Sequence, residues 1–306
     1  MLKALANRSL WLFLAVYGAA VAWLASSGQS LEDVLGAGLI LGIGLPLAAW
    51  IACLGMPAPE PPQAWEPGDG RLLLLLVAWI ILFLAFKGPL LDIFVSPGAD
   101  PRLRDTVNTA LKIAAFVAIP GALIGWQGRG WTQAGQATAT ITRIVLAFLL
   151  VAAAAFAVQF LIGSQFQKLL TGPYASRHLA VGAMFSFVWM SIEAGLVEEF
   201  FFRWYLQSRL AAWTGSQLSA VLLGALVFGV AHAPGMILRG AGLEEGLGAS
   251  PPVMATFAYA ITVQGLAGLV FGLLWARTRS FLPLVLLHGF VDALSNTAAF
   301  MDTWQL

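Results

Sequence analysis

The chain has 306 residues, of which 59% are hydrophobic and 10% are charged, and its mean hydropathy is +0.84. These values lie far from the composition of soluble domains and indicate an integral membrane protein. Sixteen Lys and Arg residues nearly balance fifteen Asp and Glu residues, so the net charge of +1 provides no basic surface and a nucleic-acid partner is not expected.

Long apolar runs recur along the whole sequence. Most approach or exceed the roughly 20 residues that a helix needs to cross the hydrocarbon core of a bilayer. None alternates apolar and polar residues as the strands of a membrane β-barrel do. We therefore predict an all-α, polytopic membrane protein with eight or nine transmembrane helices. The runs lie at about 9–26, 34–55, 72–95, 107–126, 144–163, 179–206, 217–238, 253–275 and 281–300.

A proline-rich stretch separates the first two runs from the rest. Residues 56–70 read MPAPEPPQAWEPGDG, and five prolines with three acids disfavour regular structure inside a bilayer. We predict an N-terminal transmembrane hairpin at residues 1–55, an extramembrane Pro-rich linker at 56–70, accessory transmembrane helices at 71–175 and a helical core at 176–306.

The third and fourth runs each contain a lysine and a proline. Lys87 and Pro89 lie in the third run, and Lys112 and Pro120 lie in the fourth. A proline inside a helix removes one backbone hydrogen bond, and a lysine near a helix end can extend its ammonium to the membrane surface. We interpret these runs as kinked helices or as helices with a snorkelling lysine.

Ionisable side chains also interrupt three apolar runs of the C-terminal half. A charge at membrane depth costs several kcal/mol and is rarely kept without a partner or a task. Three such segments are costly to keep for packing alone, so we expect a functional site there. The residues are Glu193, Glu198, Glu199 and Arg203 in SIEAGLVEEFFFRW, His232 in VFGVAHAPG, and His288 and Asp292 in LLHGFVDALSN.

The spacing of the acidic pair assigns the two glutamates to different directions. Glu199 and Arg203 are four residues apart on one helical face, so their side chains can pair. Glu198 is rotated from them by about 100°. One glutamate can therefore be held by the arginine while its neighbour is free to act. Glu193, which precedes Glu198 on the same helix, is the weaker candidate for a catalytic role and is expected to line a wet cavity.

The two histidines are placed for a shared site. His288 and Asp292 are four residues apart and present an imidazole and a carboxyl group to one groove. Phe228 and His232 have the same spacing, and Gly229 between them permits a close approach of helices. The three groups reach one depth only if the seventh helix extends to 239 and the sixth extends through 213, and we expect both extensions.

These groups fit peptide hydrolysis. A carboxylate with an imidazole can orient and deprotonate a water molecule, and a second imidazole can donate a hydrogen bond to the developing oxyanion. The single cysteine, Cys53, lies in another apolar run and is not a candidate nucleophile. Ser191 and Ser295 lie near the site, but neither completes an evident triad.

Two alternatives remain open at this point. Zinc can bind a set of two histidines and one glutamate, here His232, His288 and Glu198, although no HExxH motif is present. A non-enzymatic membrane scaffold or transporter could instead use the buried charges to move protons or ions. No internal repeat of the kind typical of inverted-repeat transporters is evident.

Three motifs in order resemble the signature of a known family. They are EEFFFR from Glu198 to Arg203, FGVAH from Phe228 to His232, and HGFVD from His288 to Asp292. The pattern EExxxR, FxxxH and HxxxN or HxxxD is that of the CPBP or Abi group of intramembrane proteases, which includes the type II CAAX prenyl endopeptidases. The resemblance covers about residues 180–300.

The resemblance implies a glutamic-type intramembrane protease whose catalytic helix bundle lies in the C-terminal half, with Glu198 activating water assisted by His232. Glu199 would be held by Arg203 or would contribute to the water site, and His288 with the last motif residue would stabilise the oxyanion. No cofactor is then expected, and zinc stays possible. The predicted catalytic residues are Glu198, Glu199, Arg203, His232, His288 and Asp292.

The last motif position departs from the Asn form. An ionised aspartate cannot donate a hydrogen bond to an oxyanion, so Asp292 is either protonated or orients His288 as its carboxylate partner. We favour the orienting role.

The resemblance further implies a multi-pass protein of the bacterial inner (cell) membrane. Its substrate would be a membrane protein or a lipidated peptide in the lipid bilayer, cut near its C-terminal or membrane-proximal end.

Overall fold

The computed structural model describes residues 8–28, 31–128, 130, 134–172, 176–239 and 252–306. No β-strand occurs in this part of the chain, so the prediction of an all-α fold is confirmed. The α-helices are α2 (Arg8–Ser26), α3 (Leu31–Leu39), α4 (Leu45–Ala52), α5 (Asp69–Phe94), α6 (Pro101–Ile113), α7 (Ile119–Trp126), α8 (Ile141–Ile162), α9 (Ser164–Thr171), α10 (Ser176–Met190), α11 (Val197–Glu199), α12 (Ser208–Thr214), α13 (Gln217–Arg239), α14 (Val253–Thr262), α15 (Gln264–Thr278) and α16 (Phe281–Trp304). The π-helical segments are η1 (Ile40–Gly44), η2 (Ala114–Ala118), η4 (Ser191–Leu196) and η5 (Phe200–Gln207).

Consecutive helices join into membrane-spanning rods. Within the described residues, nine helical segments are long and apolar enough to cross a membrane. Each coincides with one of the predicted runs, so the polytopic fold is confirmed at the higher of the two expected counts. Large apolar side chains on the outer surface, such as Leu74 at 71% and Ile93 at 77% exposure, fit contact with lipid.

Two spans extend further than the apolar runs alone indicate. The sixth span continues from Arg177 to Thr214 through η4, α11, η5 and α12. The seventh, α13, continues to Arg239. Both extensions were predicted, because only with them do the ionisable residues of the three motifs reach a common depth. The polar residues that directly follow the sixth run, Gln207, Ser208 and Arg209, are buried against neighbouring helices, which favours continuation of the helix there.

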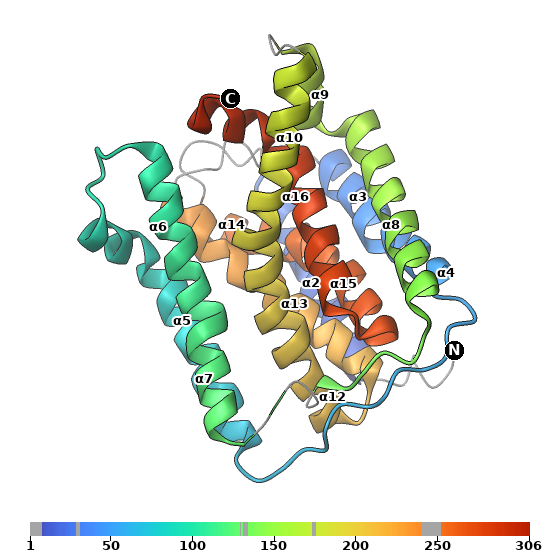
Figure 1. Cartoon of the computed structure of the whole chain (residues 1–306). Coiled ribbons are helices and arrows are strands. Elements are labelled where there is room, and N and C mark those ends of the chain that lie inside the picture. Colours follow the sequence, from blue (N-terminus) through green and yellow to red (C-terminus); the bar gives the residue numbers. More distant parts are fainter. Residues whose placement is uncertain (1–7, 29–30, 129, 131–133, 173–175, 240–251) are drawn as a thin grey trace.

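The bundle has a central group of helices flanked on two sides (Figure 1). In the centre α13 packs on α15, and α16 packs on α10 and η4. The helices α5, α6 and α7 lie on one side, where α5 contacts α13 and α6 contacts η4. The helices α3, α4 and α8 lie on the opposite side, and α4 contacts both α8 and α15. The central helices carry the three motifs.

The proline-rich segment runs along one end of this bundle. Residues 56–66 have no regular secondary structure. Their carbonyl groups serve as acceptors for core side chains, and Arg209 Nη2 donates to Gln63 O at 2.9 Å. Arg209 also forms an ion pair with Asp69 at 3.5 Å, in which both side chains are 1% exposed. These contacts attach the start of α5 to α12.

Candidate active site

The acidic motif lies in an irregular part of the sixth span. Glu198 and Glu199 belong to the short α11, which is bounded by the π-helical segments η4 and η5. A π-helix widens the backbone turn, and such segments occur frequently at functional sites. The Glu199 side chain is fully buried, whereas that of Glu198 is 15% exposed. The neighbouring carboxylates therefore face different surroundings, as their spacing predicted.

Glycines on two motif-bearing helices, α16 and α13, allow close approach to neighbouring helices. A Cβ atom on Gly289 of α16 would overlap the backbone of Ser191 in η4. On α13, a Cβ on Gly229 would lie 2.8 Å from Ala260 O of α14. Helices pack this closely in membranes where a residue without a side chain lies at the crossing. The predicted role of Gly229 in close helix approach is confirmed.

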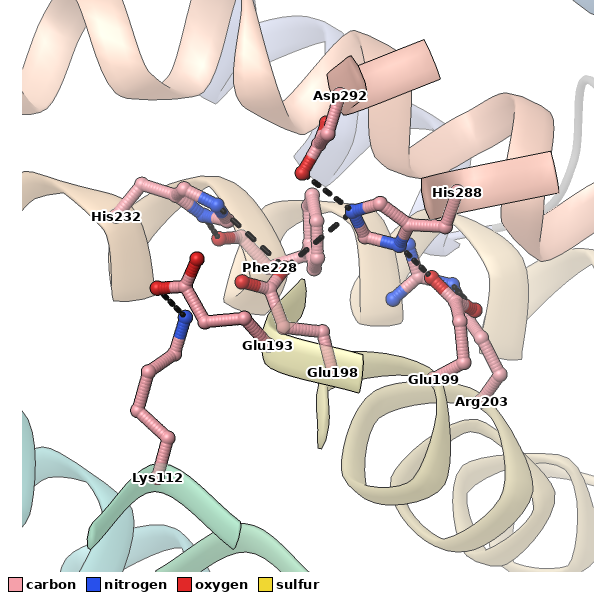
Figure 2. A network of polar contacts seen from close by, with 9 residues as sticks. All are labelled: Lys112, Glu193, Glu198, Glu199, Arg203, Phe228, His232, His288 and Asp292. Atoms are coloured by element: carbon pink, nitrogen blue, oxygen red, sulfur yellow. Dashed lines mark hydrogen bonds and ion pairs between the residues drawn. The ribbon is translucent and has the colours of Figure 1, made fainter. Parts of the chain in front are cut away.

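The two histidines converge on Glu198 (Figure 2). Glu198 Oε2 lies 3.7 Å from His232 Nε2 and 3.8 Å from His288 Nε2. The same oxygen is buried and accepts no hydrogen bond from any described residue. These separations exceed direct hydrogen bonds but allow one small bridging group between carboxylate and imidazole. The predicted convergence of the three side chains is confirmed, and their catalytic roles remain predictions.

The ring of His232 is oriented by its own helix. Its Nδ1 lies 2.8 Å from Phe228 O. A carbonyl oxygen only accepts hydrogen bonds, so Nδ1 carries the proton that is donated there. In the neutral imidazole, Nε2 is then an acceptor and faces Glu198. The Phe228 ring packs on the imidazole at a centroid distance of 4.6 Å, so this motif fixes both the tautomer and the ring position.

The ring of His288 is held by the second glutamate. His288 Nδ1 lies 2.6 Å from Glu199 Oε1, and Glu199 Oε2 lies 3.5 Å from Arg203 Nε. The predicted pairing of Arg203 with Glu199 is therefore confirmed. His288 also stacks on Phe271 at 4.6 Å. These contacts leave Nε2 of His288 directed toward Glu198.

Aromatic rings surround the arginine of this network. The centre of the Arg203 guanidinium lies 4.3 Å from the Phe228 ring, 5.8 Å from Phe271 and 6.0 Å from Phe202. A cation over aromatic faces is attracted by their quadrupoles, and this attraction offsets part of the cost of removing it from water. The arginine thus supports Glu199 from a site that water does not reach.

The orienting role predicted for Asp292 is corrected. Asp292 Oδ2 lies 3.7 Å from His288 Nε2, which is beyond hydrogen-bond distance, and its side chain is 33% exposed. Glu199 makes the orienting hydrogen bond instead. The reason is geometric, because the spacing of four residues on α16 places Asp292 beside Nε2 while Nδ1 faces α11. Asp292 is therefore next to the nitrogen that is available for chemistry.

A pocket of about 280 Å³ opens beside Glu198 and His232. Its lining includes Lys112, a cation that was not among the predicted site residues. Lys112 of α6 lies 3.2 Å from Glu193 Oε1, and Asn108 Nδ2 lies 3.5 Å from the same oxygen (Figure 2). Lys112 is directed inward, so the interpretation as a snorkelling lysine is wrong for this residue. The signal in the sequence that could have identified Lys112 as a site residue is an ionisable group within an apolar run.

The two serines near the site form hydrogen bonds with other groups, and the single cysteine is buried. Ser191 Oγ donates to Phe187 O at 2.7 Å, and Ser295 Oγ accepts from Gln159 Nε2 at 3.1 Å. Cys53 is buried at the end of α4. Among the described residues, no group of three or more His, Cys, Asp or Glu side chains has an arrangement suited to hold a metal ion.

Comparison with known proteins identifies the part of the chain that carries this site. Residues 180–294 match the family model described as type II CAAX prenyl endopeptidase Rce1-like. The match spans all three motifs and excludes Lys112 and Asn108. No curated protein and no solved structure matches the chain. The chain is thus a multi-pass integral membrane protein, and the match over residues 180–294 supports its assignment to the CPBP/Abi family of intramembrane proteases.

Proposed function

We propose that the protein is a glutamic-type intramembrane endopeptidase that cuts a membrane-associated protein near its C-terminal or membrane-proximal end. The observation that carries this proposal is that Glu198 Oε2 lies 3.7 and 3.8 Å from two imidazole Nε2 atoms, and that Glu198 and His232 line one wall of a pocket. The same proposal includes a membrane protein or a lipidated peptide as the substrate. It also places the protein in a bacterial inner membrane.

Water activation follows from the two acceptors on this wall. An ionised Glu198 accepts one hydrogen of a water molecule, and Nε2 of neutral His232 accepts the other. With both hydrogens directed away, a lone pair of the water oxygen points to the peptide carbonyl. Glu198 removes a proton as the new C–O bond forms. The same proton is then delivered to the amide nitrogen when the C–N bond breaks, which restores the carboxylate.

His288 is suited to stabilise the oxyanion. Its Nδ1 proton is donated to Glu199 at 2.6 Å, so donation to the substrate requires a second proton on Nε2. The carboxylates of Glu199 and Asp292, on opposite sides of the ring, supply negative charge for such an imidazolium. Asp292 thereby assists through charge and not through a hydrogen bond that orients the ring.

Replacement of Glu198 tests this proposal. The full-length chain and its Glu198→Gln variant would be reconstituted with solubilised membrane proteins of the host, and new peptide termini would be identified by mass spectrometry. We expect new termini with the parent protein and a loss of about 10³-fold or more with Glu198→Gln. Glu60→Gln removes an exposed carboxylate of the proline-rich segment and serves as the control. Equal cleavage by parent and Glu198→Gln would refute the proposal.

Zinc chemistry on Glu198, His232 and His288 is the alternative, and it requires all three atoms at about 2.0–2.2 Å from one ion. We expect cleavage to survive exhaustive treatment with a zinc chelator. Activity that disappears with the chelator and returns with added Zn²⁺ would favour the metalloprotease. Absence of any cleavage product from the parent protein, together with a phenotype that Glu198→Gln preserves, would favour a scaffold or transporter.

A further inference from the structure

The pocket beside Glu198 is built from two parts of the chain. One wall consists of motif-bearing elements, including Glu198 of α11 and His232 of α13. The facing wall comes from accessory helices that lie outside residues 180–294. A peptide that reaches Glu198 through this pocket therefore contacts both walls. The accessory residues of the lining are Leu84, Lys87, Asn108, Lys112 and Phe116.

Lys112 lies within the apolar part of the accessory wall. Its apolar run covers residues 107–126, and at about 1.5 Å per residue Lys112 lies roughly 8 Å from the first end and 21 Å from the other. An ammonium at that depth is costly unless it has a partner or a task. Its side chain is 15% exposed and lines the pocket, so the ammonium is accessible to a molecule that enters there.

The partner of Lys112 shows which chemistry this position binds. Glu193 Oε1 accepts from Lys112 Nζ at 3.2 Å and lies 3.5 Å from Asn108 Nδ2. An ammonium and an amide thus hold a carboxylate at the pocket wall. The Glu193 side chain is 22% exposed, so it is not enclosed by the core in the way that Glu199 is. A carboxylate from outside can take its place without disturbing buried packing.

We propose that Lys112 and Asn108 form a carboxylate-binding subsite for the peptide substrate, in which a substrate carboxylate replaces Glu193. The inference rests on the proposed peptidase function and adds a specificity determinant from outside the family-matched segment. The carboxylate can be the C-terminal one or that of an Asp or Glu side chain near the bond that is cut. Glu193 serves as the resident counter-ion when no substrate is bound.

Binding of defined peptides tests the subsite without requiring cleavage. The full-length chain with Glu198→Gln would be placed in lipid nanodiscs, and Kd would be measured by calorimetry. The first probe pair is acetyl-Ala-Leu-Val-Ala-Leu as free acid and as C-terminal amide. The second pair is acetyl-Ala-Leu-Glu-Ala-Leu-amide and the same peptide with Gln in place of Glu. The first pair reports on the C-terminal carboxylate, and the second reports on a side-chain carboxylate.

We expect the carboxylate form of at least one pair to bind about tenfold tighter than its neutral partner, because a charge-assisted hydrogen bond is formed. Adding Lys112→Met should abolish that difference and leave the Kd of the neutral peptide unchanged. Lys112→Arg should retain most of the difference. Glu193→Gln removes the resident competitor and should strengthen binding of the carboxylate form. Lys168→Met, which removes an exposed lysine of α9, is the matched control.

The inference fails if neither pair shows a difference, or if the difference survives Lys112→Met. Equal weakening of charged and neutral peptides by Lys112→Met also contradicts it, because that result assigns Lys112 a structural role. If Lys112→Met does not fold, Asn108→Ala decides, with selective weakening of the carboxylate form as the supporting result. Cleavage plays no part in these measurements, so failure of the subsite and failure of the proposed peptidase function are separate outcomes.

Discussion

Two groups of charged side chains lie near Glu198, and they are built differently (Figure 2). The inner network of Glu199, Arg203 and His288 has side chains that are at most 6% exposed and lies within the family-matched segment. The outer pair of Lys112 and Glu193 is 15% and 22% exposed, and its lysine comes from an accessory helix. The difference separates two tasks. The inner network fixes the position of a ring, whereas the outer pair is open to a ligand.

After that of Glu198→Gln, the largest expected effect on cleavage is at His232. His232→Leu removes the acceptor that faces Glu198, so we expect the rate of cleavage to fall by about 10²-fold or more. His178→Leu removes an exposed histidine of α10 and should change nothing. The rate of cleavage is measured as the release of peptides from a membrane-protein substrate by each variant. A rate for His232→Leu equal to that of the control would contradict the water-orienting role.

The inner network predicts a large change in stability. Arg203→Met leaves Glu199 as a buried carboxylate without its cation, which we expect to lower the free energy of unfolding by about 3–5 kcal/mol. The double variant Glu199→Gln with Arg203→Met removes both charges and should recover part of that loss. Equilibrium unfolding in mixed micelles provides the comparison. Additive losses in the double variant would show that the two side chains do not interact.

A smaller loss is expected where α16 crosses η4. Gly289→Ala places a methyl group against the Ser191 backbone, so overpacking should cost about 1–3 kcal/mol and displace His288 from Glu198. Gly18→Ala on α2 is the control, because a Cβ there meets no atom within 4 Å. The Tm and the cleavage rate should both fall for Gly289→Ala and should stay unchanged for Gly18→Ala. An unchanged protein would mean that the helices can separate at this crossing without cost.

The smallest effect is expected at Asp292. Because Glu199 and not Asp292 hydrogen-bonds His288, Asp292→Asn should keep the cleavage rate within about tenfold of the parent. Glu199→Gln is the informative comparison, since it weakens the hydrogen bond that orients the ring. We expect a greater loss from Glu199→Gln than from Asp292→Asn. The reverse order would restore Asp292 to the orienting role.

Local sequence was sufficient for several features of the protein. The spans follow from hydropathy, which is a property of neighbouring residues, and each predicted run has a matching helix among the described residues. The pairing of Glu199 with Arg203 follows from a spacing of four residues on one helix. The candidate residues of the three motifs were found because charge in an apolar run is visible without a structure.

Other features depend on how separate helices are rotated and packed. Glu199 and His288 are 89 residues apart, and Lys112 and Glu193 are 81 residues apart. No spacing rule connects residues on different helices. Glu198 and Glu199 lie between two π-helical segments, and α16, which carries His288, crosses η4 at Gly289. Sequence therefore determined which residues were candidates, whereas the packing of helices decided that Glu199 holds His288 and that Lys112 faces the pocket.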